Sequence, residues 1–196
     1  MSGRGLRQFA RDFPSQWGKR GLIMDDRWNH GGFVAPMILA HLGRKLLAVA
    51  GSRYGNLDTV PSHAFHGYLA CLINRQGGSD CETFALGFKQ FKLGSVIGTR
   101  TWGGWVGLRG FIPLRDGGYI TQPEFGGWDP QGKDWIIEGH GVDPDVELDL
   151  NADGLIHGND VQLDYAIDQL LQKIAQDPRD LPKPPPIRPR PLVPVK

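Results

Sequence analysis

The first half of the chain alternates between short apolar runs and longer segments whose apolar residues follow helical spacing. Short continuous apolar runs between turn signals are typical of buried strands. The runs expected to form strands are 21–25, 46–50, 68–74 and 95–98. The segments expected to form helices are 6–13, 34–42 and about 82–92. This alternation predicts an α/β fold with a mostly parallel sheet flanked by helices.

The second half of the chain is patterned differently. Residues 111–121 predict a hairpin insertion, because an Asp-Gly turn signal separates two apolar stretches. Residues 135–137 predict one more short strand, and residues 161–174 predict an amphipathic helix. The residues expected on the buried face of that helix are Leu163, Ala166, Ile167, Leu170 and Leu171.

Composition limits what the chain can be. Its 196 residues suffice for one domain with a real core, and 40% of them are hydrophobic. The formal net charge of +1 gives no reason to expect nucleic acid or an acidic membrane as a partner. The last residues are rich in proline and lack apolar periodicity. We therefore expect a domain over 1–178 and a tail over 179–196 that is disordered or an interaction arm.

Cysteine usage and the N-terminal sequence bear on the compartment. The chain has two cysteines, Cys71 and Cys81, which do not form a disulfide framework and favour a reducing environment. The basic N-terminal residues are not followed by the apolar run of a secretory signal, and no apolar stretch is long enough to span a bilayer. These observations predict a cytoplasmic protein.

A glycine–serine turn is the first candidate for chemistry. Gly77-Gly78-Ser79-Asp80 follows the strand expected at 68–74 and precedes a helix. Glycines allow a sharp turn that exposes the serine hydroxyl, and the helix N-terminus behind it offers free N–H groups to an oxyanion. Ser79 is therefore a candidate nucleophile. The alternative is an ordinary helix cap, in which Ser79 or Asp80 satisfies the first helical amides and has no other role.

A second glycine-rich turn, Asn29-His30-Gly31-Gly32, also joins a strand to a helix. Parallel α/β sheets gather such turns at the carboxyl ends of their strands. A backbone N–H at or near Gly32 and the N–H of Asp80 would together form an oxyanion hole. The alternative is a loop that needs glycine only for steric reasons.

Several segments, in the right order, resemble one family. The segment from Gly21 to Gly32 is similar to the GLIxDxRxNxGG segment of the tail-specific, or C-terminal processing, serine peptidases. Three later segments resemble the tricorn branch of that superfamily, namely Gly78–Asp80 with its helix, Leu93–Gly104 and Glu138–Asp145. The resemblance runs from about Leu6 to Ile174.

The resemblance implies a ClpP/crotonase-like fold and a serine endopeptidase that acts on short or unfolded polypeptide segments. Ser79 matches the nucleophile, the amides of Asp80 and of Gly31 or Gly32 match the oxyanion hole, and Glu138 matches the glutamate of a Ser–His–Ser–Glu tetrad. That glutamate acts through a second serine to orient the histidine. The family also implies a homo-oligomer, and neither the residues nor the resemblance calls for a cofactor or a metal.

The histidine and second serine of the tetrad belong to an upstream segment that has no counterpart here. None of the six histidines of this chain occupies a matching position. A serine without a base is a poor nucleophile, so we expect the chain alone to be inactive and to need that segment as a partner. The runner-up hypothesis is a non-catalytic peptide-binding or assembly module that kept the peptidase fold.

The chain departs from the family pattern at His30, at Cys81 and at Gly139. His30 stands where glycine is usual, Cys81 where a small residue is expected, and Gly139 in place of an asparagine. If the two glycine turns adjoin, His30 could reach Ser79 as a base, although an exposed loop histidine is the simpler interpretation.

Two metal sites are alternative interpretations of other segments. His63 and His66 with one of the cysteines could bind zinc, but no second ligand pair is placed for it. Residues 149–160 carry oxygen side chains at calcium-loop spacing, with Asp160 as the last ligand, in the manner of dockerin loops. The competing interpretation of 149–160 is an Asx-rich turn that caps the last helix.

Substrate contacts are the least determined part of the sequence. Exposed aromatic and basic residues beside the nucleophile could line a peptide groove, and the candidates are Arg100, Trp102, Trp105 and Trp128. Asp58 and Asp26 are possible acidic residues for a basic substrate side chain.

Overall fold

A computed structural model describes residues 1–52 and 54–186 of the chain. Its centre is a parallel sheet of four strands in the order β1-β4-β5-β8. The strands are β1 (Gly21–Asp25), β4 (Tyr68–Ile73), β5 (Gly94–Gly98) and β8 (Val146–Glu147). β4 lies inside the sheet and reads as a continuous apolar run because both of its faces are covered. The expected parallel α/β fold is confirmed.

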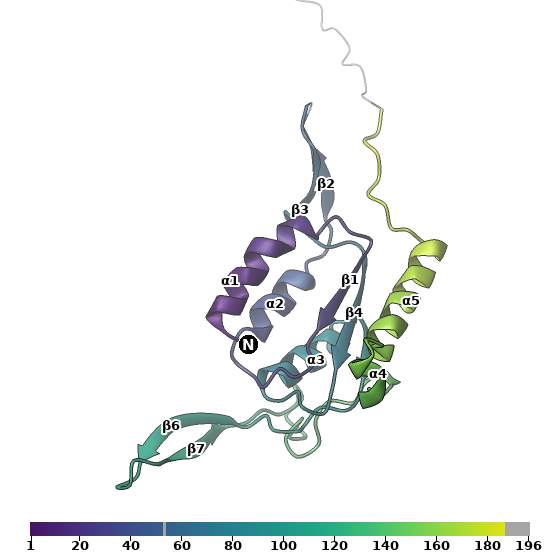
Figure 1. The fold of residues 1–196 in the computed structure, drawn as a ribbon. Helices are drawn as coiled ribbons and strands as arrows, with labels where there is room; N and C mark the ends of the chain where they lie inside the picture. Colours follow the sequence, from purple (N-terminus) through teal and green to yellow (C-terminus); the bar gives the residue numbers. More distant parts are fainter. Residues whose placement is uncertain (53, 187–196) are drawn as a thin grey trace, which may run out of the picture.

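Helices cover both faces of this sheet (Figure 1). They are α1 (Gly3–Asp12), α2 (Ala35–Leu42), α3 (Asp80–Gln90), α4 (Ala152–Ile156) and α5 (Val161–Gln176), with a 3-10 turn at Phe13–Ser15. Alternate residues of β4 point to opposite faces. Leu69, Cys71 and Ile73 pack under α2 and α3, whereas Ala70 and Leu72 pack under α5.

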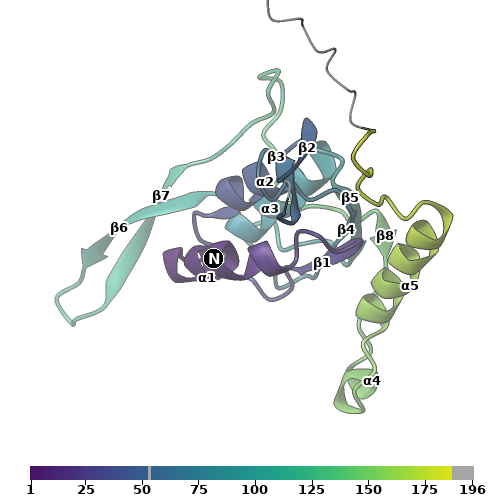
Figure 2. The ribbon, with the colours of Figure 1, turned by 90° about the horizontal axis from the view of Figure 1, so that it is seen from above.

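Two antiparallel hairpins extend from the body (Figures 1 and 2). One pairs β2 (Ala48–Gly51) with β3 (Leu57–Val60), and the other pairs β6 (Gly107–Pro113) with β7 (Tyr119–Phe125). The second confirms the expected hairpin insertion. The apolar run at 46–50 forms its strand in the first hairpin and not in the central sheet, because its partner is the nearby segment 57–60.

Two further expectations were wrong in detail. Residues 135–137 form no strand, and Trp135 makes only an isolated bridge to Trp128. On α5, Ile167 and Leu171 are exposed, while Gln162 is buried beside Ala166 and Leu170. The buried stripe is narrow because α5 packs against the sheet alone. The Gln162 side chain donates to the Leu148 carbonyl at 2.6 Å, which satisfies its burial.

The chain after α5 leaves the helix without regular structure as far as residue 186. Its first residues contact the body: Arg20 makes an ion pair with Asp180 at 2.8 Å, and the guanidinium of Arg179 lies 3.8 Å from the ring centre of Tyr68. The remainder of the expected tail, 187–196, lies outside the described residues. Within the described ranges, every helix is too short or too polar to cross a membrane.

Candidate active site

Ser79 lies at the sharp turn between β4 and α3. Its backbone has φ 57° and ψ −116°, a sparsely populated conformation for a residue with a side chain. Such strain persists only where the surroundings determine it, and it gathers at functional sites. Ser79 is the N-cap residue of α3 and stands in a capping-box position with Glu82, but its hydroxyl makes no side-chain cap hydrogen bond. The serine is therefore held in a strained turn with its oxygen free.

The buried carboxylate of Glu82 holds this turn in place. Its Oε2 accepts from the N–H of Ser79 at 3.0 Å and of Gly104 at 3.1 Å. Its Oε1 accepts from the N–H of Gly103 at 2.6 Å and from the Thr101 hydroxyl at 2.7 Å. Glu82 is fully buried, and four donors compensate its charge. Its role was missed from the sequence, although Ser79-x-x-Glu82 has the spacing of a capping box.

Asp80 ties the two glycine turns together. One of its carboxylate oxygens accepts from the N–H of Val34 at 2.7 Å and of Ala35 at 3.0 Å, which are the first amides of α2. The side chain thus caps a helix distant in sequence, where a negative charge also suits the helix dipole. The N–H of Asp80 donates to no described residue.

Gly31 lies directly against Ser79. A Cβ at this position would lie 2.7 Å from the Ser79 Cβ and 2.9 Å from its Oγ, so only glycine fits here, and its φ of +115° also favours glycine. The Gly31 N–H donates to the Asn29 Oδ1 at 3.1 Å, whereas the Gly32 N–H donates to no described residue. The amides of Gly32 and Asp80 are thus free of partners among the described residues, and both residues line the cavity that Ser79 borders.

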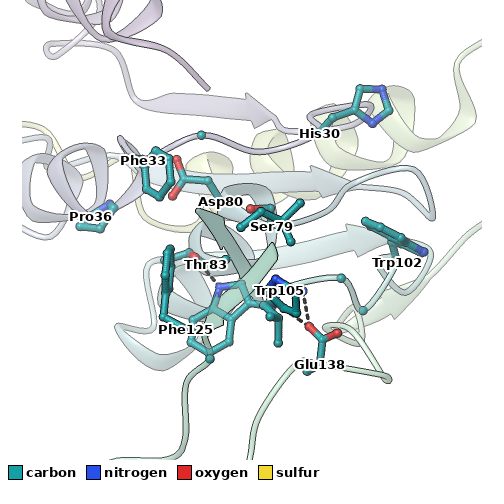
Figure 3. A pocket seen from close by; sticks show the side chains of 18 residues that line it. His30, Phe33, Pro36, Ser79, Asp80, Thr83, Trp102, Trp105, Phe125 and Glu138 are labelled. Atoms are coloured by element: carbon teal, nitrogen blue, oxygen red, sulfur yellow. Dashed lines mark hydrogen bonds between the residues drawn. The ribbon is translucent and has the colours of Figure 1, made fainter. Parts of the chain in front are cut away.

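A cavity of about 740 Å³ opens beside Ser79 (Figure 3). Its apolar wall comes from the start of α2, the loop before β6 and the β6–β7 hairpin. The residues are Phe33, Pro36, Trp105, Val106, Leu108, Pro123 and Phe125. Its polar lining includes His30, Thr83 and Glu138, and the Trp105 indole donates to the Thr83 hydroxyl at 2.7 Å. The cavity therefore offers apolar surface next to the free hydroxyl, as ligand pockets commonly do.

Glu138 lies on the wall of this cavity. Its Oε2 accepts from the N–H groups of Trp105 and Val106, both at 2.6 Å (Figure 3). Its Oε1 accepts no hydrogen bond from the described residues. The carboxylate is thus fixed at one oxygen and open at the other.

All six histidines lie in the described part of the chain, and none hydrogen-bonds to Ser79. His30 lines the cavity, but its ring points away from Ser79 (Figure 3). His41 packs edge-on against Phe13 at 4.5 Å between ring centres, and burial lowers its pKa. His140 lies between Arg100 and Asp143, with its Nε2 at 2.7 Å from the Asp143 carboxylate. No histidine of the described residues is therefore hydrogen-bonded to Ser79.

The expected substrate-contact residues separate into two groups. Trp102 lines the cavity, as does Trp105, whereas Arg100, Asp58 and Trp128 do not. The Asp58 carboxylate is engaged by the Ser62 hydroxyl at 2.8 Å, which with nearby backbone amides lowers the pKa of Asp58. Asp26 is buried below the Gly31 turn and does not face the cavity.

The described residues contain no cluster of three His, Cys, Asp or Glu side chains placed to hold a metal ion. Residues 149–160, which have the spacing of a calcium loop, contain the N-caps of α4 and α5. Asn151 Oδ1 accepts from the amides of Asp153 and Gly154 at the start of α4. Asp160 caps α5 through the Leu163 amide and makes an ion pair with Arg27 at 2.7 Å. This geometry is that of Asx caps.

A strained serine beside two free amides and an apolar pocket is the arrangement that acyl-transfer enzymes use. The chain belongs to peptidase family S41, whose model matches residues 1–148. It is 39% identical over 185 residues to the tricorn protease of Thermoplasma acidophilum, an alignment that covers 94% of this chain and 17% of that protein. It is also 38% identical over 175 residues to a tricorn protease homolog of Saccharolobus solfataricus, covering 89% of this chain and 16% of that protein.

A solved structure agrees with these relatives. The crystal structure of the tricorn protease matches with a TM-score of 0.80 and 40% identity, over 87% of this chain and 17% of that chain. The chain thus spans about a sixth of the length of the relatives it matches, and the resemblance stated from the sequence is confirmed.

Proposed function

We propose that this chain carries the nucleophile, the oxyanion hole and a substrate pocket of a serine endopeptidase. The observation that carries this proposal is the placement of Ser79. Its strained turn leaves the hydroxyl free, and Gly31 allows the second glycine turn to approach it closely. Membership of peptidase family S41 supports the same conclusion.

In the proposed reaction, the Ser79 Oγ attacks the carbonyl carbon of a peptide bond and passes its proton to a histidine base. The carbonyl oxygen becomes an oxyanion, which accepts hydrogen bonds from the amides of Asp80 and Gly32. We favour Gly32 over Gly31 because the Gly31 amide already donates to Asn29. The carbon–nitrogen bond then breaks as the base returns the proton to the leaving amine, and water hydrolyses the acyl-enzyme.

The base and its supporting serine are proposed to come from a further polypeptide segment. Glu138 supports this assignment, because its Oε2 is held by two amides while its Oε1 is free to accept from an incoming serine hydroxyl. Without that segment, Ser79 has no general base, and we expect little or no hydrolysis.

The pocket favours substrates with a large apolar side chain next to the cleaved bond. Phe33, Phe125 and Leu108 present apolar surface there. The one carboxylate of the α3 N-terminus that borders the pocket, Asp80, is directed to the amides of α2. The substrates proposed are therefore unfolded segments or short peptides with aromatic or long aliphatic residues.

A fluorophosphonate probe tests the nucleophile. The purified chain is treated with the probe, alone and with a polypeptide that supplies the Ser–His segment of a tricorn relative, and the adduct is located by mass spectrometry. We expect labelling at Ser79 only with the added segment, and none in Ser79→Ala. Ser15→Ala, an exposed serine remote from the pocket, is the matched control and should label like the unmodified chain.

The alternative is a binding or assembly module that kept the fold, and the free hydroxyl does not exclude it. Peptide binding without labelling, in the presence of the Ser–His segment, would favour the module. Labelling that persists in Ser79→Ala would contradict both the assignment of the nucleophile and the proposed chemistry.

A further inference from the structure

A buried carboxyl that the proposed chemistry does not use lies beneath the Gly31 turn. Asp26 follows the end of β1 and is 5% exposed. Its Oδ1 accepts from the Asn29 Nδ2 at 2.7 Å, while its Oδ2 is buried and has no partner among the described residues. It borders a second cavity of about 330 Å³, which is also lined by Met24, Val34, Ile38 and Phe84.

Asn29 connects this carboxyl to both glycine turns. Its Oδ1 accepts from the Gly31 N–H at 3.1 Å and from the Met1 α-amino group at 3.0 Å. Its backbone carbonyl accepts from the Gly78 N–H at 3.0 Å, one residue before Ser79. The hydrogen bond to Asp26 and the two donors at Oδ1 together orient the amide, with the NH₂ group facing the carboxyl and the oxygen facing Gly31.

We propose that Asp26 is a positioning residue which, through Asn29, holds the N–H of the His30–Gly31 peptide and so sets the position of the Gly32 N–H one residue further on. This inference rests on the proposed oxyanion role of Gly32. If Asp26 accepts more weakly, the Asn29 NH₂ group is held less firmly, and the amide is fixed mainly by the two donors at its oxygen. The Asn29 side chain and the glycine turn bonded to it would then shift.

The surroundings of Asp26 make its effect on Asn29 depend on pH. Burial is the main cause that raises the pKa of Asp26 to about 7, and the negative charge of Asp80 acts in the same direction. The hydrogen bond from Asn29, the nearby Cys81 thiol and the charge of the Met1 α-amino group oppose that rise. The groups that face this cluster from the neighbouring elements are Asp25, Cys71, Asp80, Cys81 and the Met1 α-amino group. Ionised Asp26 binds the Asn29 amide more strongly than neutral Asp26, because charge-assisted hydrogen bonds are stronger.

Nuclear magnetic resonance of the whole chain tests the coupling without any hydrolysis. The amide signals of Gly31 and Gly32 and the side-chain amide of Asn29 are followed from pH 5 to pH 9. We expect them to shift together with one midpoint near that of the Asp26 carboxyl. In Asp26→Asn the shift should be lost. In Asn29→Ala, Asp26 should still titrate while Gly31 and Gly32 no longer respond.

Two controls separate the titration of Asp26 from that of other groups. Asp12→Asn, an exposed carboxyl on α1, should leave the titration unchanged. Because the Met1 α-amino group also donates to the Asn29 Oδ1, the experiment is repeated with that amine acetylated. Flat Gly31 and Gly32 signals in the unmodified chain would overturn the inference, even if Asp26→Asn failed to fold. A shift that persists in acetylated Asp26→Asn would also overturn it. Failure of fluorophosphonate labelling would count against the proposed reaction but would leave this readout intact.

Discussion

The Ser79 turn and the β6–β7 hairpin border the same pocket but are held in opposite ways. The turn is anchored by the fully buried Glu82 carboxylate with its four donors, one of them the Gly104 N–H, and Gly31 packs against Ser79. In the hairpin, every residue except Gly107 is exposed, and its two strands pair only with each other. An isolated two-stranded hairpin is marginally stable in water. The groups proposed to react are therefore held by the core, while much of the apolar surface beside them comes from a weakly supported extension.

One face of the hairpin continues the apolar wall of the pocket. Leu108 and Phe125 line the pocket, and farther along the hairpin the rings of Phe111 and Tyr119 meet edge to face at 5.0 Å. The opposite face carries the exposed Arg109–Glu124 ion pair at 3.1 Å. The difference between the two regions can be tested by substitutions that should affect one and not the other.

Removing the Glu82 carboxylate should have the largest effect. Glu82→Ala leaves the amides of Gly103 and Gly104 and the Thr101 hydroxyl without their buried acceptor. We expect the free energy of unfolding to fall by about 3–5 kcal/mol, the range for breaking a buried charged network. Urea denaturation measures it. The matched control is Glu124→Ala on the hairpin, which should cost less than about 1 kcal/mol. Equal losses for the two variants would contradict the comparison.

A side chain at Gly31 should have the next largest effect. Gly31→Ala combines a positive φ with a Cβ that would overlap Ser79, and we expect a loss of about 2–3 kcal/mol together with loss of probe labelling. Gly110→Ala is the matched control, because Gly110 also has a positive φ (+74°) but no neighbour within 4 Å. That hairpin variant should lose only about 1 kcal/mol and keep its labelling. Thermal unfolding and mass spectrometry provide the two measurements.

The pH dependence of the free energy of unfolding should reveal the buried carboxyl of Asp26. Because the folded-state pKa of Asp26 is raised to about 7, the folded chain binds more protons than the unfolded chain between about pH 4 and pH 7. This group alone then makes the protein more stable as the pH falls, by about 1 kcal/mol between pH 7 and pH 6. Asp26→Asn should remove that slope. Asp160, whose pKa is lowered mainly by its hydrogen bond with Arg27, acts oppositely at lower pH. An unchanged slope in Asp26→Asn, measured by urea denaturation at each pH, would refute this assignment.

The smallest effect on stability is expected at the tip of the hairpin. Phe111 is 70% exposed, so Phe111→Ser should change the free energy of unfolding by less than about 0.5 kcal/mol. Phe88→Ser, on the buried face of α3, is the contrasting variant and should be strongly destabilising. A loss above about 1 kcal/mol at Phe111 would show that the hairpin is more firmly attached than its exposure indicates.

Local patterns predicted much of the molecule. The apolar runs at 21–25, 68–74 and 95–98 became the central strands, because a strand covered on both faces must be apolar throughout. The Gly-Gly-Ser sequence predicted the turn at Ser79 because sharp turns need glycine. The strand at 46–50 was found, but its place in a separate hairpin was not, because apolarity does not identify the pairing partner.

What the sequence alone determined was the α/β alternation, the two glycine turns and the family. These depend on spacing, turn chemistry and motif order, which act over a few residues or are read directly along the chain. Only the tertiary structure decided that Glu82 anchors the Ser79 turn, that Asp80 caps α2 and that Asp26 is buried under Gly31. The sequence does not show whether a given Asp or Glu side chain is exposed or buried. Its role follows from which distant donors the fold brings within hydrogen-bond distance and from how much water the fold removes.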